Sequence, residues 1–127
     1  MSDTIDLIRR FCDDWGKGAN VDEIVDYFTD DAIYHNIPVE PAVGKDAIRA
    51  TFAMFTTGVE RIEFRILNIA ADGDTVLTER VDVFVLPHAT IELPVMGTFE
   101  VRGGKIAKWR DYFDLNQYMT QLAGSAG

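Results

Sequence analysis

Apolar residues in the first half of the chain recur at every third or fourth position in three segments. This spacing predicts α-helices over residues 4–17, 21–28 and 44–57. The Asn20 side chain can accept a hydrogen bond in the first turn of the second helix, and Gly58 is a typical residue to end the third.

Downstream of the third helix the pattern changes to strands and turns. Long strands are predicted over residues 61–71, 75–86, 88–101 and 105–113. Residues 32–36 form a short earlier strand, and residues 115–122 close the chain as a helix or a tail. Pro94 lies inside a long strand and predicts a bulge or an edge there, because proline cannot donate to a ladder.

This order of elements predicts an α+β fold, with the helices on one side of a largely antiparallel sheet. Long bent strands with one covered face can fold around a cavity. The 127 residues contain no repeat and no linker, so we expect one domain over residues 1–127, with residues 123–127 as a flexible tail.

The composition restricts the partners and the compartment. A net charge of −9 argues against nucleic acids and anionic membrane surfaces as partners. No apolar run approaches the roughly 18 residues of a membrane span. Residues 1–5 lack the features of a signal peptide, so we expect a cytoplasmic protein. The single Cys12 excludes an intramolecular disulfide, and its place in a helical stripe favours packing.

Several kinds of chemistry lack the residues they need. The only serines, Ser2 and Ser125, lie at the two ends, which argues against a serine nucleophile. His35, His88 and Cys12 do not have the spacing of a zinc site. No glycine-rich phosphate loop follows a strand. We therefore expect chemistry based on carboxylates, arginine, tyrosine and amides, with no cofactor and no metal.

Three charged residues occupy strand positions that a half-buried sheet normally excludes. Alternation places Arg80 and Asp82 on an apolar face of one strand and Asp111 on an aromatic face of the last strand. Their burial is costly unless they pair with one another. Two carboxylates held by one arginine can share a proton, which suits acid–base chemistry. An ion-pair network that only fixes strand register is the alternative.

A second polar pair precedes the third helix. Tyr34 and Asn36 lie on one strand face, where a phenol and a carboxamide can hold a water against a carboxylate. The alternative is a strand end with a turn-forming asparagine. His35 faces the other way and reads as structural or exposed. Large apolar residues could form either the core or a pocket lining: Phe52, Met54, Phe55, Leu93, Met96, Phe99, Leu115 and Met119.

Three segments in this order resemble the limonene-1,2-epoxide hydrolase family: residues 34–38 (YHNIP), 79–83 (ERVDV) and 104–115 (GKIAKWRDYFDL). The resemblance covers nearly the whole chain. It implies a fold related to nuclear transport factor 2 and ketosteroid isomerase. In such a fold, a cone-shaped, strongly bent, mixed or antiparallel sheet packs against three to four N-terminal helices around one apolar pocket.

The resemblance also implies a site and a reaction. Tyr34 and Asn36 would position a water, Arg80 would bridge the carboxyls, Asp82 would protonate the epoxide and Asp111 would deprotonate the water. The reaction would convert a small apolar epoxide to the vicinal diol in one step, without a covalent intermediate, in a homodimer. By analogy with inverting glycosidases, we expect the carboxyls to be roughly 6.5–9.5 Å apart.

Two other functions are compatible with these residues. A ketosteroid-isomerase-like or cyclase-like enzyme of the same fold would move a C–H proton to an aspartate base. A non-catalytic module would bind a small ligand or only dimerise, since the fold does not determine the function. A solvated arginine would favour the second.

Overall fold

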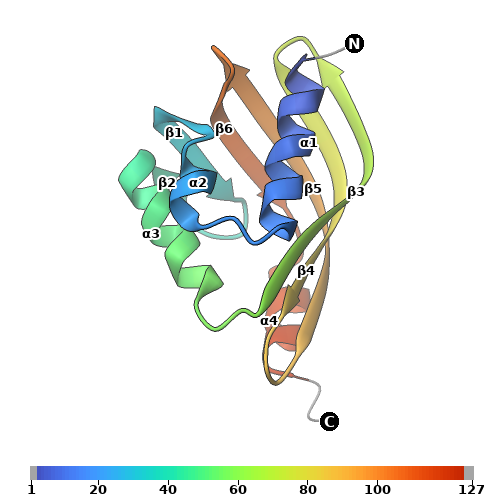
Figure 1. Cartoon of the computed structure of the whole chain (residues 1–127). Helices are drawn as coiled ribbons and strands as arrows, with labels where there is room; N and C mark the ends of the chain where they lie inside the picture. The colour runs from blue at the N-terminus through green and yellow to red at the C-terminus, as the bar shows by residue number, and fades with distance from the viewer. Residues whose placement is uncertain (1–2, 125–127) are drawn as a thin grey trace.

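The structure is a computed structural model that describes residues 3–124 (Figure 1). The helices of this part of the chain are α1 (Asp3–Gly16), α2 (Val21–Val25), α3 (Lys45–Thr56) and α4 (Leu115–Leu122). The strands are β1 (Phe28–Asn36), β2 (Ala42–Val43), β3 (Arg61–Asp72), β4 (Thr75–Val85), β5 (Thr90–Arg102) and β6 (Lys105–Tyr112). Within residues 3–124, no helix has both the length and the apolar character needed to cross a bilayer.

The strands form one open, mixed sheet in the order β2-β1-β6-β5-β4-β3. β1 runs parallel to β6, and the other neighbours are antiparallel. Figure 1 shows the sheet bending around α1, while α2 and α3 lie beside β1 and β2. The predicted α+β fold is confirmed. Three helices precede the long strands, and the fourth helix, α4, is C-terminal and packs against β5.

The core lies between α1 and the inner face of the sheet. The predicted apolar stripe of α1 is buried, and Cys12, at 2% exposure, is part of it. Phe11 makes edge-on contacts with several other rings, including Trp109 at 5.1 Å between ring centroids. This aromatic core holds the Trp109 ring in a fixed position, and the charged residues lie beside that ring.

The predicted helices and long strands agree with the structure to within two residues at each end, but the region between α2 and β1 does not. α2 ends at Val25, not at residue 28, although Asn20 forms the expected cap. Phe28 already pairs with Ile106 of β6, which starts β1 earlier than predicted. The two-residue strand β2 was not predicted. Tertiary pairing therefore overrides the local helical pattern here.

Pro94 lies in a part of β5 that has β4 on one side and no strand on the other, because the pairing with β6 begins at Met96. On the open side, the Gln121 side chain of α4 donates to the Glu92 carbonyl at 3.0 Å and accepts from the Glu92 N–H at 2.7 Å. Pro94, two residues on, faces this same open side, so its missing N–H removes no ladder hydrogen bond. The edge alternative is therefore the correct one.

Residues 123 and 124, the first two of the predicted tail, cap the C-terminus of α4. Ala123 donates its N–H to the Met119 carbonyl and Gly124 donates to the Gln121 carbonyl, each at 3.0 Å. The rest of the predicted tail, residues 125–127, lies outside the described residues. A single domain over the whole chain stays a prediction.

Candidate active site

The guanidinium of Arg80 is the centre of the site and is 1% exposed. Its Nε and Nη2 each donate to Asp82 at 2.9 Å. Nη2 and Nη1 donate to the two oxygens of Asp111 at 2.7 and 3.2 Å, and Nη1 also donates to the Thr78 hydroxyl at 3.0 Å. All five N–H groups of the arginine are therefore satisfied, which a buried cation requires.

The sheet register explains how Arg80 on β4 reaches Asp111 on β6, two strands away. Gly97 of β5 lies between them and pairs with Thr78 on one side and Asp111 on the other. A Cβ at Gly97 would overlap both Arg80 Nη1 and Asp111 Oδ1. The absent side chain leaves the gap that the guanidinium fills. Gly97 was not among the predicted site residues; a glycine inside a long strand was its signal.

Asp111 has a third donor that the sequence interpretation missed. Trp109, two residues earlier on β6, donates its Nε1–H to Asp111 Oδ1 at 2.7 Å. Trp109 is fully buried, so this bond is shielded from water. Asp111 therefore receives three hydrogen bonds from protein side chains, whereas Asp82 receives two, both from Arg80.

Tyr34 and Asn36 lie on the same side of β1, as predicted, and next to Asp111. The parallel pairing of β1 with β6 sets Asn36 opposite Asp111 and Tyr34 opposite Trp109. The Tyr34 hydroxyl donates to Asn36 Oδ1 at 3.0 Å, and its ring stacks on Trp109 at 4.4 Å. The phenol oxygen can still accept, and the Asn36 amide can still donate.

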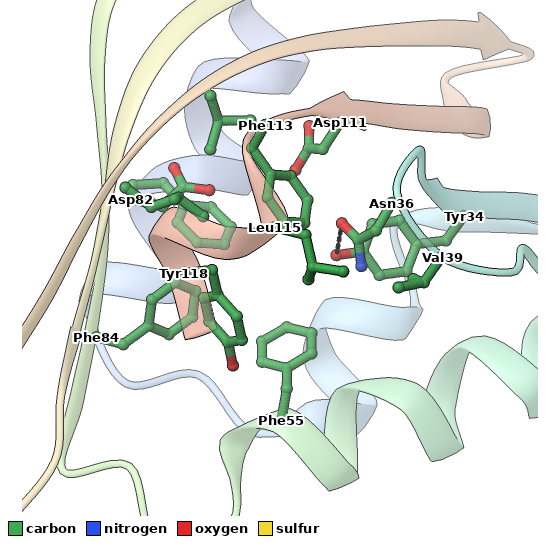
Figure 2. A pocket seen from close by; sticks show the side chains of 13 residues that line it. Tyr34, Asn36, Val39, Phe55, Asp82, Phe84, Asp111, Phe113, Leu115 and Tyr118 are labelled. Atoms are coloured by element: carbon green, nitrogen blue, oxygen red, sulfur yellow. Dashed lines mark hydrogen bonds between the residues drawn. The ribbon is translucent and has the colours of Figure 1, made fainter. Parts of the chain in front are cut away.

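These groups form the polar end of a cavity of about 160 Å³ (Figure 2). Asp82 and Asp111 face it from one end, and rings from α3, β4 and α4 close the other. Its lining residues are Tyr34, Asn36, Val39, Phe55, Phe64, Asp82, Phe84, Leu93, Val95, Asp111, Phe113, Leu115 and Tyr118. Arg80 lies behind the carboxylates and does not line the cavity. A mostly apolar pocket with a few convergent polar groups is typical of a small-molecule site.

The comparison with known families agrees with this geometry. The family model described as the limonene-1,2-epoxide hydrolase catalytic domain matches residues 3–124. The chain belongs to this family. The resemblance that the three sequence segments predicted is confirmed.

Individual relatives are consistent with membership of the limonene-1,2-epoxide hydrolase family. Epoxide hydrolase EphG of Mycobacterium tuberculosis is 38% identical over 86 residues, which is 68% of this chain and 57% of that protein. The chain thus matches little more than half of EphG's length. A solved M. tuberculosis epoxide hydrolase described as LEH-like superposes with a TM-score of 0.82 at 29% identity, over 96% of this chain and 91% of that one.

A more distant relative supports the fold alone. The structure of a putative SnoaL-like polyketide cyclase from Shewanella putrefaciens superposes with a TM-score of 0.85 at 16% identity. The superposition covers 97% of this chain and 98% of that one. Because a fold does not determine a function, the function has to be argued from the side chains.

Eight apolar residues were expected in the core or in a pocket lining, and this is correct for five of them and wrong for the three methionines. Phe55, Leu93 and Leu115 line the cavity, while Phe52 and Phe99 belong to the core. The three methionines are exposed: Met54 at 73%, Met96 at 52% and Met119 at 52%. Met96 lies between two inward-facing residues of β5, so alternation turns it to the outer face. The other two lie on the solvent sides of α3 and α4.

Burial and the positive charge of Arg80 act in opposite directions on the pKa of Asp82. Burial raises the pKa of Asp82 to about 6; Arg80 opposes this rise and the nearby Asp111 carboxylate adds to it. Burial also raises the pKa of the Tyr34 phenol, so Tyr34 is neutral and keeps its proton. With one proton on Asp82, the buried triad carries one cation and one anion and is neutral overall, which lowers its desolvation cost.

Asp82 and Asp111 lie closer together than expected. This is shown by the two carboxyl oxygens that both accept a hydrogen bond from Arg80 Nη2. These two oxygens lie 2.9 and 2.7 Å from that nitrogen, so they cannot be farther apart than the sum of these distances, which is below 6.5 Å. The glycosidase analogy fails because one guanidinium nitrogen ties both groups together. An epoxide ring, with three atoms, also needs less room between acid and base than a sugar.

Neither histidine belongs to the site. His35 Nε2 lies 2.9 Å from the Val39 carbonyl oxygen, and His88 Nε2 lies 2.9 Å from the Leu122 carbonyl oxygen. Both contacts are local or structural, as expected for His35. Residues 3–124 contain no group of three or more histidine, cysteine or acidic side chains placed to hold a metal.

Proposed function

We propose that this protein hydrolyses a small apolar epoxide to its vicinal diol by direct attack of water. One observation carries the proposal: a single buried arginine holds two carboxyl groups at the polar end of an apolar pocket, beside a phenol and an amide. Membership of the limonene-1,2-epoxide hydrolase family supports it.

The water would be held by three groups at the β1–β6 junction. It would donate one hydrogen to Asp111 and the other to the Tyr34 oxygen, and would accept from the Asn36 amide. This leaves one lone pair of the water free to attack an epoxide carbon. The hydrogen bond from Tyr34 to Asn36 Oδ1 supports this assignment, because it fixes which atoms are left to donate and accept.

The proton balance of the step is closed. As the water oxygen bonds to carbon, Asp111 takes its proton and the C–O bond of the ring breaks. Asp82 gives its proton to the departing oxygen. The triad has moved one proton from Asp82 to Asp111, so its total charge is unchanged and Arg80 stays paired throughout.

The other two functions have less support. A proton-transfer enzyme of the ketosteroid-isomerase kind needs no water site beside its base, whereas Tyr34 and Asn36 provide one. A module that only binds ligands or dimerises does not need a buried Arg80 with all its donors satisfied by carboxylates and a hydroxyl.

A screen of apolar cyclic and aryl epoxides for diol formation tests the activity. A single turnover with excess enzyme in ¹⁸O-water then tests the route. We expect ¹⁸O in the first diol formed, because a held water attacks. Unlabelled first diol, with label left in Asp111 or Asp82, would instead indicate an ester intermediate. Solvent hydrogen exchange into an enone without any diol would favour the isomerase.

We also propose a homodimer, formed by the outer face of the sheet. Met96, its cross-strand partner Tyr112, and Leu77 are about half exposed on that face. Sedimentation should give a dimer for the wild type. Met96→Glu should yield monomers, because a charge would be desolvated in the interface. Met54→Glu on α3 is the matched control and should stay dimeric. A monomeric wild type would contradict the proposal.

The cytoplasmic location stays a prediction.

A further inference from the structure

Trp109 connects the two halves of the candidate site. Its ring is held between two others: Tyr34 on one side, with centroids 4.4 Å apart and planes 25° apart, and Phe99 on the other, at 5.3 Å and 18°. The indole is fully buried, so this stack fixes its plane. The fixed plane aims Nε1–H at Asp111 Oδ1, while the same ring supports the phenol that holds Asn36.

The donors around the two carboxyl groups are unequal. Arg80 gives two hydrogen bonds to each, so the arginine alone does not distinguish them. The Trp109 bond is the difference. Each bond donated to a carboxylate favours its ionised form. An indole N–H is a donor only, so it cannot accept from a protonated Asp111.

We infer that Trp109 is a positioning residue that keeps Asp111 ionised and leaves the shared proton of the pair on Asp82. The indole thereby decides which carboxyl group is the base and which is the acid. The kinetic part of this inference rests on the proposed hydrolysis, since an acid and a base must then act together.

The other ionisable groups near the pair do not offer a competing explanation in the neutral range. Those that face it in the described residues are Arg80 on β4, Tyr34 on β1, Cys12 on α1 and Tyr118 on α4. Burial raises the pKa of the Cys12 thiol to about 12, and burial also raises the pKa of Tyr34 and of Tyr118. The face of β5 toward the pair carries no ionisable side chain near it. A change in the pH profile below pH 9 would thus report on the two aspartates.

The test compares Trp109→Phe with Trp15→Phe. Both remove a buried indole and leave a smaller ring in an aromatic core. Trp15 Nε1, however, has no hydrogen-bond partner in the part of the chain that the structure describes. Trp15→Phe therefore controls for lost packing, and only Trp109→Phe removes a bond to a carboxylate. The readouts are kcat and kcat/KM against pH, and a thermal melt of each variant.

We expect Trp109→Phe to lower kcat by about 10- to 100-fold, since a hydrogen bond to a charged group is lost. The acid limb of its kcat/KM profile should move to higher pH, because the pair of carboxyl groups then lacks a donor that favours its ionised form. Trp15→Phe should leave both limbs in place. A Trp109→Phe enzyme with a uniformly lower rate and unmoved limbs would overturn the inference, because packing alone would explain it.

A second variant covers the case in which Trp109→Phe does not fold. In the Trp15→Phe background, Trp109 is the only tryptophan, so a tryptophan auxotroph can replace it with benzothienylalanine, which keeps the fused rings but has sulfur in place of N–H. The same limb shift is expected, and an unmoved limb would again overturn the inference. A wild-type protein that forms no diol would contradict the proposed function instead. In that case, ¹³C NMR of labelled aspartate carboxyls tests the inference: the proton must move from Asp82 toward Asp111 in the substituted protein.

Discussion

Replacing Asp111 with asparagine should remove nearly all diol formation while the protein stays folded. The amide keeps the shape of the side chain but cannot take a proton from water, and a general base typically contributes 10²–10⁴-fold. The charge balance adds a second loss. Without the Asp111 carboxylate, an ionised Asp82 already neutralises Arg80, so Asp82 is expected to give up the proton that it must donate.

The measurement is kcat of Asp111→Asn on the best epoxide found in the screen, with a thermal melt to check folding. Asp13→Asn is the control, because Asp13 is exposed on α1 and does not line the cavity. It should keep wild-type activity. An Asp111→Asn enzyme that retained more than about a tenth of wild-type kcat would show that Asp111 is not the base.

The charged centre could be predicted because its residues occupy strand positions that are normally apolar. Arginine and aspartate on an apolar strand face are costly, and alternation alone places Arg80 beside Asp82. What alternation cannot supply is the register between strands. Arg80 reaches Asp111 only because Gly97 of the intervening strand lies between them. A glycine within a strand was visible in the sequence, but its partners were not.

The water site shows the same limit. Tyr34 and Asn36 share a face by alternation, and that much followed from the sequence. Their place beside Asp111 depends on a parallel pairing of β1 with β6, between segments that are far apart in the chain. Alternation also placed Trp109 on the same strand face as Asp111, but nothing local distinguishes a core indole from one whose N–H donates to a carboxylate.

Arg80→Ala should be the most destabilising of the substitutions considered. Removal of the cation leaves two carboxyl groups buried without their partner, at a cost of about 3–5 kcal/mol in the free energy of unfolding. These groups can avoid the cost only by holding protons in the folded state, while free aspartate in the unfolded chain loses its proton near pH 4. The folded state then binds more protons than the unfolded state, so stability falls as pH rises. The loss relative to wild type should be greater at pH 8 than at pH 5.

Urea unfolding at these two pH values measures the effect. Arg102→Ala is the matched control, because Arg102 pairs with Asp31 at the surface with both side chains more than half exposed, and such pairs contribute little. Arg80→Lys should recover little of the loss, since an ammonium has three donors and cannot replace five donors in a planar fork. If Arg80→Ala unfolded at the wild-type urea concentration at both pH values, the arginine would not be neutralising buried carboxylates. The acid–base pair on which the proposed hydrolysis depends would then not be assembled in solution.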